Sequence, residues 1–465
     1  MKSPSILRLT GPLVVSFWLR SAFAWVDTFF AAELEDLEQV PGLGDASIAA
    51  IGLALPFEFL TIACWVGSSN GLTTRLAAAM GAGESEKVEQ LKRASTRIIW
   101  ALCWAFLALA AGIWWLSPYV LEDPLLARQF QLYGTILIGG SALTSFWAIV
   151  PDSVVKAHQD TRGTMWAGLL STFTNVIMNT IFVFVFGWGI IGIAASTVLS
   201  RVFALAYAWR VAARHERQRI AACTDPKPGR FEEPVRAILA LAIPGALTYL
   251  LMSVESLAVL GLIANLPPAE QAVSLLAAWS IFDRALRFLL MPGIACSVAL
   301  LPLAARYSGQ GDYQQIGLEL RTAERAGWVY SLALVLPMVI FGGPWLARAL
   351  SETPATRQFA EDGMLWVFVG VLVSIPFFLA RSTFDGLQRP RPGLIASTVR
   401  AFLLFIPGMA IGYVAAEAMG ISPMHGLCAG ASLGLLGGSL LIRNWIGRQL
   451  KELAAECRTK VSKPA

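Results

Sequence analysis

The chain has 465 residues, of which 56% are hydrophobic and only 14% are charged, and its formal net charge is +5. Soluble domains carry about 25% charged residues, so a chain this apolar lacks the polar surface needed to cover a globule. The mean hydropathy of +0.61 leads to the same conclusion. Composition therefore argues against a soluble protein and predicts one that folds in a lipid bilayer.

Long uncharged runs define the predicted membrane spans. Three runs contain no charged residue, namely 98–116, 326–347 and 363–380. Each approaches or exceeds the roughly 20 residues that cross the hydrocarbon core of a bilayer. Because backbone groups in lipid must find hydrogen-bond partners within their own segment, the spans are predicted to be helices. We predict twelve spans, at about 9–33, 47–73, 95–118, 130–153, 164–186, 189–210, 237–263, 272–302, 326–347, 363–386, 393–416 and 424–446.

The second half of the chain repeats the first. Residues 81–84 (Gly-Ala-Gly-Glu), after the second predicted span, correspond to residues 309–312 (Gly-Gln-Gly-Asp) after the eighth. Residues 157–162, after the fourth span, correspond in the same way to residues 386–391 after the tenth. A repeat of six spans preserves orientation in the membrane, which predicts two halves related by a pseudo-two-fold axis along the membrane normal.

The predicted fold is therefore an all-α polytopic membrane protein with twelve transmembrane helices in two six-helix lobes. We predict an N-terminal lobe at 1–210, a cytoplasmic linker at 211–236, a C-terminal lobe at 237–446 and a cytoplasmic tail at 447–465. Bilobed helical proteins of this kind generally change the side to which a central cavity opens. This is an architecture for transport.

Basic residues crowd alternate connections between the predicted spans. They include Lys87, Lys92, Arg93, Arg97, Lys156, Arg162, Arg214, Arg217, Arg219, Lys227, Arg230 and Arg236. The other connections carry mainly acidic residues, among them Glu33, Glu35, Asp36, Glu38, Glu122 and Asp123. Since Lys and Arg mark the cytoplasmic side, we predict a multi-pass protein of the cell inner membrane with both termini in the cytoplasm. The net positive charge comes mostly from these cytoplasmic Lys and Arg residues. It is therefore no evidence of a nucleic-acid partner, and none is predicted.

Asp27 lies deep in the first predicted span, within Trp25-Val26-Asp27-Thr28. An ionisable group at the middle of a membrane helix costs about 2.5–3.5 kcal/mol on insertion scales, so its presence asks for a reason. The functional interpretation is a proton- or cation-binding site. The alternative is a helix end, with Asp27 among the lipid headgroups.

Two amides in the fifth predicted span and a hydroxyl in the sixth form a second candidate group. Asn175 and Asn179 are four residues apart and so share one helix face, and Thr197 follows in the sixth span. Oxygen ligands of this kind suit a hard cation. Hydrogen bonding between helices is the alternative, and spacing alone favours it.

The second half carries its own intramembrane charges. Glu255, in the seventh predicted span, is the acid that matches Asp27 and is a candidate for a substrate or cation site in the C-terminal lobe. The others are Asp283, Arg284, Arg287, Arg381 and Asp385.

Enzyme signatures are missing from the sequence. It contains no His-Glu-x-x-His motif and no Walker A motif, and we predict no catalytic residues, no cofactor and no resident metal. Without an ATP-binding domain, a pump would have to use an ion gradient.

From about residue 9 to residue 446 the chain resembles the multidrug and toxic compound extrusion (MATE) family. The overall pattern looks closest to the prokaryotic branch similar to the DNA-damage-inducible F exporters. The residues that carry the resemblance are Val26-Asp27-Thr28, Ala49-Ala50, Gly81-Ala82-Gly83-Glu84, Asn175-x-x-x-Asn179 and Gly192-Ile193-Ala194-Ala195-Ser196-Thr197.

The resemblance implies an antiporter that exports bulky organic cations of xenobiotic type by alternating access, in exchange for protons or sodium. It implies a cation or proton site at Asp27, Asn175, Asn179 and Thr197, which is also where sodium would bind if it is the coupling ion. The implied partners are a small-molecule cargo, the coupling ion and the lipid bilayer, and a monomer is expected.

The chain departs from the family pattern at two places. Asn179 stands where the family often has Asp, which removes one negative charge, weakens a sodium site and favours proton coupling. Glu255 corresponds to a seventh-span acid that some relatives pair with a tenth-span acid. The position expected for that partner falls near Ser374, which cannot ionise.

Two other functions are open from the sequence. A lipid-linked sugar precursor flippase of the same superfamily would need cavity-facing arginines for its phosphate, and the candidates are Arg20, Arg201, Arg284, Arg287 and Arg381. A membrane-embedded enzyme is the more remote alternative, because no catalytic motif supports it.

Overall fold

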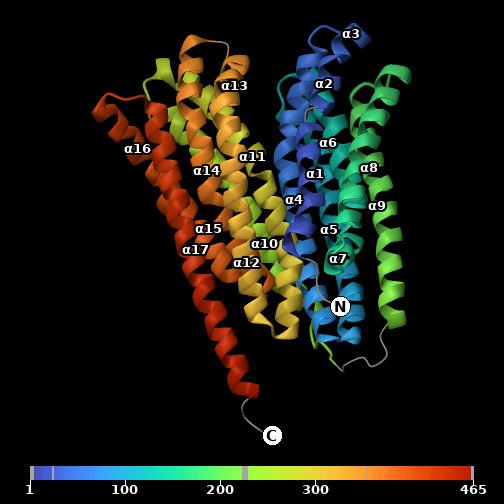
Figure 1. Ribbon diagram of the computed structural model, residues 1–465. Coiled ribbons are helices and arrows are strands. Elements are labelled where there is room, and N and C mark those ends of the chain that lie inside the picture. The colour runs from blue at the N-terminus through green and yellow to red at the C-terminus, as the bar shows by residue number, and fades with distance from the viewer. Residues whose placement is uncertain (1–4, 24–25, 223–228, 352, 462–465) are drawn as a thin grey trace. The chain divides into compact units, whose positions relative to one another are not determined.

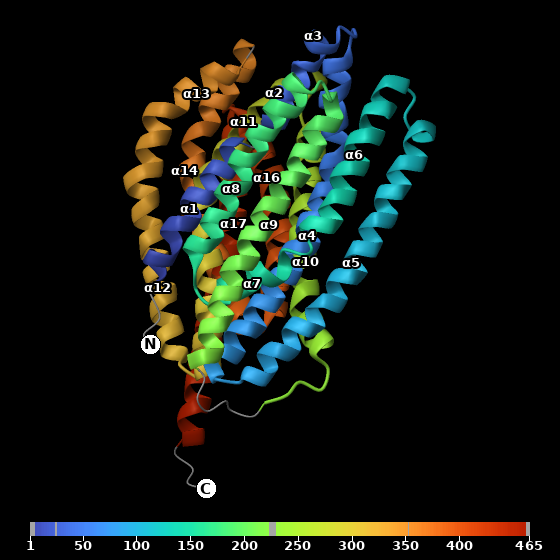
Figure 2. The same ribbon diagram turned by 90° about the vertical axis from the view of Figure 1, so that its right-hand side faces the viewer.

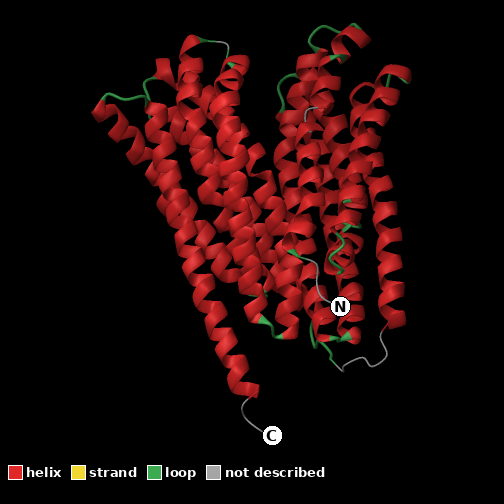
Figure 3. Ribbon diagram, in the orientation of Figure 1, coloured by secondary structure: helices red, strands yellow, loops and turns green. Residues whose placement is uncertain are grey.

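The computed structural model describes residues 5–23, 26–222, 229–351 and 353–461 (Figure 1). Within these ranges every regular element is a helix (Figure 3), which confirms the all-α prediction. In chain order the helices are α1 (Ile6–Phe23), α2 (Val26–Ala32), α3 (Leu34–Glu38), α4 (Leu43–Ala82), α5 (Ser85–Val120), α6 (Pro124–Thr144), α7 (Ile149–Ala157), α8 (Thr161–Thr180), η1 (Ile181–Val185), α9 (Gly189–Ala222), α10 (Pro234–Asn265), α11 (Ala269–Gln310), α12 (Tyr313–Tyr330), η2 (Ser331–Val335), η3 (Met338–Gly342), α13 (Gly343–Leu350), α14 (Pro354–Gly386), α15 (Pro390–Thr398), η4 (Val399–Phe405), α16 (Ile406–Met419) and α17 (Pro423–Val461). The η elements are π-helical turns.

The helices account for the predicted spans. In the part of the chain that the structure describes, ten helices are long and apolar enough to cross a membrane, and the pair α6 and α7, bent by 49°, makes an eleventh. The remaining predicted span, 9–33, falls on α1 and α2, which lie on either side of residues 24–25, outside the described residues. Eleven of the twelve predicted spans therefore coincide with a helix or bent helix pair that is long and apolar enough to cross a membrane.

Packing divides the chain into two compact units, which we call the N-terminal unit (Val15–Ala246) and the C-terminal unit (Met1–Val14 with Leu247–Ala465). Helix α1 and helix α10 each contribute to both units, because the divisions fall within them. Helix α9 continues to Ala222 and α10 begins at Pro234. Much of the segment predicted as a linker, 211–236, is therefore helical.

In the N-terminal unit α4, α5, α6, α8 and α9 are the long helices (Figure 2). Helix α5 packs on α6, α8 packs on α9, and α4 packs on α6 and α7. A Cβ atom at Gly140 of α6 would overlap Val198 of α9, and small residues of this kind let membrane helices approach closely. The short helix α2 packs on α4 and α9 and also contacts α8. This packing brings the first predicted span beside the polar residues of the fifth and sixth.

In the C-terminal unit α11 packs on α14, and α17 packs on both α14 and α16. Facing glycines lie where α16 meets α17, with Gly408 against Gly430 and Gly412 against Gly426. A Cβ atom at any of the four would overlap backbone atoms of the other helix. Glycine at these positions therefore allows the two backbones to pack in direct contact.

The internal repeat extends to the backbone conformation of two turns. Gly83 caps the C-terminus of α4 and Gly311 caps that of α11, with left-handed φ values of 79° and 77°. Gln159 and Gln388 both have φ of 61°. Residues other than glycine rarely adopt this conformation, so its recurrence at repeat-related positions supports the sequence match.

Candidate functional site

Asp27 lies in the first turn of α2 and is half-buried. Its partner Thr197 lies on α9, eight residues after Gly189 begins that helix, which is about 12 Å at 1.5 Å per residue. The contact with Asp27 is therefore made well inside an apolar helix. This position favours an interior carboxylate over one among the lipid headgroups.

Both carboxylate oxygens of Asp27 accept hydrogen bonds from residues that the sequence singled out. Asn179 Nδ2 donates to Oδ1 at 2.8 Å, and Thr197 Oγ1 donates to Oδ2 at 3.0 Å. Asn175 Nδ2 donates to Thr197 Oγ1 at 3.0 Å, and Asn179 Nδ2 donates to Asn175 Oδ1 at 3.4 Å. The structure thus brings the four predicted residues into one network, while their role as an ion site stays a prediction.

Ser196 completes this network. Its hydroxyl donates to Asn179 Oδ1 and lies 3.5 Å from Asn175 Nδ2, and both Ser196 and Asn179 are fully buried. A hydroxyl has one proton to donate, and Ile193 O lies 2.8 Å from Ser196 Oγ as a competing acceptor. Ser196 lies inside the motif quoted from the sequence, but its neighbour Thr197 was singled out instead.

The network also joins two helices. Asn175 and Asn179 of α8 contact Ser196 and Thr197 of α9, as the helix–helix interpretation predicts. Two of these side chains, Asn179 and Thr197, also donate hydrogen bonds to the carboxylate of Asp27. Any change in the charge of Asp27 therefore acts directly on the contact between α8 and α9.

A second acid and an arginine lie beside Asp27. Arg201 of α9 donates from Nη2 to Glu58 Oε1 of α4 at 3.2 Å and from Nη1 to Ser141 Oγ of α6. Glu58 and Arg201 both interact electrostatically with Asp27, and the buried Tyr133 of α6 interacts with all three. The site therefore contains two carboxylates and one guanidinium.

Glu58 was not predicted as a site residue, although the sequence holds a signal for it. It lies within Pro56-Phe57-Glu58-Phe59, inside the second predicted span. The rule that singled out Asp27, an ionisable group in an apolar span, applies to it equally. Its pairing with Arg201, 143 residues away, depends on the packing of α4 against other helices and cannot be predicted from either segment.

Glu255 in the C-terminal unit is paired with an arginine. Arg400 of η4 donates from Nη2 to Glu255 Oε2 at 2.9 Å and lies over the ring of Phe377, with its Cζ atom 4.5 Å from the ring centroid. Arg400 is 5% exposed. The charge of Glu255 is thus compensated within the protein, which leaves its role in substrate or cation binding a prediction.

Other intramembrane arginines also have acidic partners. Arg287 pairs with Asp283 at 2.6 Å, and Arg381 lies 3.7 Å from Asp385. The side chain of Arg20 lies outside the described residues.

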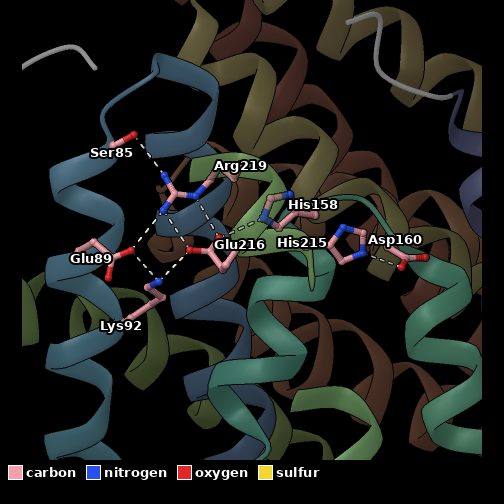
Figure 4. Close-up of polar contacts among 8 residues, drawn as sticks. All are labelled: Ser85, Glu89, Lys92, His158, Asp160, His215, Glu216 and Arg219. Carbon is pink, nitrogen blue, oxygen red and sulfur yellow. Dashed lines mark hydrogen bonds and ion pairs between the residues drawn. The ribbon is translucent and has the colours of Figure 1, made fainter. Parts of the chain in front are cut away.

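A polar network lies at the end of the N-terminal unit that carries the α4–α5 turn (Figure 4). We call it the linker-end network, and its members are Ser85, Glu89, Lys92, His158, Asp160, His215, Glu216 and Arg219. Glu216 accepts from Lys92 at 2.7 Å, from Arg219 at 3.0 Å and from His158 at 3.1 Å. The rings of His158 and His215 stack with centroids 5.0 Å apart. These contacts tie the α7–α8 turn to the ends of α5 and α9.

Asp160 connects this network to the start of α8. Its Oδ1 atom accepts from the backbone N–H of Gly163 at 2.9 Å, and its Oδ2 atom lies 2.8 Å from His215 Nε2. The hydrogen bond from His215 lowers the pKa of the Asp160 carboxyl, and the Gly163 N–H lowers it further. Asp160 therefore acts as a helix cap that also carries a charge-assisted bond.

No group of three or more His, Cys, Asp and Glu side chains in the described part of the chain could hold a metal ion.

A family model, two sequence relatives and a solved structure all relate the chain to multidrug transporters or multidrug resistance proteins. The MatE family model matches residues 12–181 and 244–411. The chain is 25% identical to the probable multidrug resistance protein NorM of Thermotoga maritima over 86% of this chain and 82% of that protein. It is 22% identical to the probable multidrug resistance protein YpnP of Bacillus subtilis over 77% of this chain and 78% of that protein. The structure is also similar to the outward-facing conformation of a MATE family transporter of the MOP superfamily, with a TM-score of 0.82, 18% identity and 96% of each chain covered.

We predict that Asp160→Asn lowers the free energy of unfolding of the purified protein by about 1 kcal/mol at pH 7, because Asn keeps the cap but loses the charge-assisted bond. A carboxyl group whose pKa is lowered by folding stabilises the protein above its unfolded pKa, about 3.9, and loses this contribution as the pH falls through its folded pKa. The difference between variant and wild type should therefore shrink below about pH 4.

The control is Asp123→Asn, since Asp123 caps α6 by accepting a hydrogen bond from Leu125 N at 2.9 Å and has no hydrogen bond to a histidine in the described part of the chain. It should change stability by less than about 0.5 kcal/mol. Denaturant titration of both variants in detergent at several pH values makes the comparison. Equal and pH-independent losses in the two variants would contradict the role assigned to His215.

Proposed function

Because the chain belongs to the MatE family, we propose that it is a secondary active antiporter that exports small organic cations in exchange for protons. Members of this family are multi-pass membrane transporters and not enzymes. The observation that carries the proposal is the carboxylate of Asp27, held between α8 and α9 by Asn179 and Thr197.

The chemistry of coupling follows from this carboxylate. In its ionised form Asp27 accepts from Asn179 and Thr197, and these bonds stabilise the charge in apolar surroundings. A proton on Asp27 removes the charge and weakens both bonds, so that α2 is held less tightly against α8 and α9. A proton can therefore bias the conformation of the unit, which is what coupled alternating access requires.

Proton coupling is favoured over sodium coupling by the residues around Asp27. Asn179 supplies a neutral amide where a second carboxylate would strengthen a sodium site, and it presents a donor group to Asp27. Hard cations take oxygen ligands, several at a time. A proton needs only the carboxylate.

The charge of the N-terminal unit supports a cationic cargo. Asp27 and Glu58 together carry two negative charges against the one positive charge of Arg201. A net negative site is complementary to an organic cation. A xenobiotic-type cargo is proposed because both sequence relatives are named probable multidrug resistance proteins.

A lipid-linked sugar flippase is the second candidate, but the arginines of the C-terminal unit that could bind its phosphate are already paired. Arg287, Arg381 and Arg400 each lie within 4 Å of an acidic group. A phosphate-bearing cargo would have to displace these acids. Efflux and accumulation assays with cationic dyes, set beside a flipping assay with a lipid-linked sugar in vesicles, separate the two candidates.

We also propose that the protein lies in the cell inner membrane as a monomer with both termini in the cytoplasm. The excess of basic residues at alternate connections supports the cytoplasmic location of the termini. In a cysteine-free background, Glu232→Cys, an exposed position before α10, should react with an impermeant maleimide only after the cells are permeabilised. Glu122→Cys, exposed between α5 and α6, should react in intact cells. The opposite pattern would reverse the proposed orientation.

We predict that Asp27→Asn lowers proton-driven export at least about tenfold, a loss of at least 1.4 kcal/mol in transition-state terms. The amide keeps the size of the carboxyl group and can accept one of its two hydrogen bonds, but it cannot take up a proton. Insertion should become slightly easier, since a neutral amide costs less in lipid than an ionised carboxylate. Dye uptake into everted vesicles, where export from the cytoplasm fills the lumen, measures the effect after normalisation to the amount of folded protein.

Asn179→Ala is the matched variant. It removes one hydrogen bond to Asp27, so a partial loss of about two- to tenfold is expected under proton coupling. Equal damage from the two substitutions would point to a coordinated sodium ion, because coordination needs every ligand. Wild-type efflux by folded Asp27→Asn protein would refute the proposed mechanism.

A further inference from the structure

Arg201 is the cationic residue near Asp27 in the N-terminal unit, but its guanidinium group is bound by other residues. Its guanidinium is bound by Glu58 of α4 at 3.2 Å and by the buried Ser141 of α6. Asp27 accepts hydrogen bonds instead from Asn179 and Thr197. Two carboxylates thus lie near one guanidinium, and Glu58 is the one that holds it.

Arg201 is attached at a place from which it can reach Asp27. It lies four residues after Thr197 on α9, and residues at this spacing have Cβ atoms about 5–6 Å apart on the same helix face. The Thr197 hydroxyl is itself 3.0 Å from Asp27 Oδ2. Arginine has a long flexible stem, and the side chain of Arg201 is 29% exposed and not locked in the core.

The position of the Arg201 guanidinium depends on which nearby carboxyl group is ionised. An arginine inside an apolar bundle needs an anionic partner, because an unpaired charge there is costly. Guanidinium–carboxylate pairs are among the strongest hydrogen-bonded pairs in proteins. If Glu58 were neutral, Asp27 would be the carboxylate on the same side of α9, because Thr197, one turn before Arg201, donates to it. Arg201 would then occupy Asp27 as a tethered cation.

We propose that Glu58 is a positioning residue that holds Arg201 away from Asp27, and so keeps Asp27 free to accept the coupling ion. The inference rests on the proposed function only in calling that ion a coupling ion. It assigns a role to two residues outside the Asp27–Asn179–Thr197 contact. With Arg201 on Glu58, the two acids and one base leave a net charge of −1, which one proton or one monovalent cation neutralises.

The test measures the reactivity of Asp27 itself. Dicyclohexylcarbodiimide is an apolar reagent that modifies carboxyl groups in apolar surroundings when they carry a proton and not when they are held in an ion pair. We expect modification of Asp27 in the purified wild-type protein, read by peptide mass spectrometry. In Glu58→Gln the modification should fall at least about tenfold, because Arg201 moves onto Asp27.

The double variant shows whether Glu58→Gln acts by releasing Arg201 or by disrupting the structure around Asp27. Glu58→Gln with Arg201→Gln again leaves one negative charge at the site, so modification of Asp27 should return to within about twofold of wild type. Glu58→Asp keeps the charge and should behave like wild type. Glu89→Gln is the control, since it removes an acid paired with Lys92 and Arg219 in the linker-end network. It should leave Asp27 reactive.

The outcomes separate this proposal from the proposed function. Wild-type reactivity of Asp27 in Glu58→Gln, or no recovery in the double variant, would overturn the positioning role even if the protein exports cargo. The expected pattern in a protein that exports no cargo would uphold the positioning role and refute the transport proposal. If Glu58→Gln does not give monodisperse protein, Glu58→Ala repeats the test against the double variant Glu58→Ala with Arg201→Gln.

Discussion

A carboxylate inside an apolar helix bundle must be compensated, and the compensation of Asp27 organises the N-terminal unit. Asn179 reaches it from α8 and Thr197 from α9, while Asn175 and Ser196 orient those two donors. An ionised group without such partners would cost several kilocalories per mole in lipid. The charge of this one side chain therefore acts on residues of both α8 and α9.

The two units handle intramembrane charge differently. In the N-terminal unit Asp27 is satisfied by neutral donors, while Arg201 is bound by Glu58. In the C-terminal unit Glu255 is paired directly with Arg400. A carboxylate held by neutral donors can change its protonation without breaking an ion pair, whereas Glu255 cannot. This asymmetry supports the proposal that ion coupling takes place in the N-terminal unit, although the two halves share a repeated sequence.

Much of the architecture could be predicted because the bilayer imposes simple rules on the sequence. Uncharged runs of sufficient length predicted the spans, and the repeat at Gly83 and Gly311 reappears as a repeated left-handed turn. Asp27, Asn175, Asn179 and Thr197 stood out as polar groups in apolar segments, and they lie together.

Pairings between distant helices could not be predicted. The partners Glu58 and Arg201 are 143 residues apart, and Glu255 and Arg400 are 145 apart. Each of these pairs depends on which helix faces which, and that depends on close packing such as Gly140 against Val198. Ser196 was missed for a simpler reason, because a serine beside a threonine carries no separate signal in one sequence.

The central claim is that Asp27 exchanges a proton when cargo binds. Calorimetric titration of a cationic cargo into purified protein, in two buffers of different ionisation enthalpy, counts the protons released on binding. We expect proton release on cargo binding that rises toward one proton per cargo as the pH is lowered and Asp27 becomes protonated in the free wild-type protein, and none in Asp27→Asn. The same proton release in both proteins, or none in either across the pH range, would contradict it.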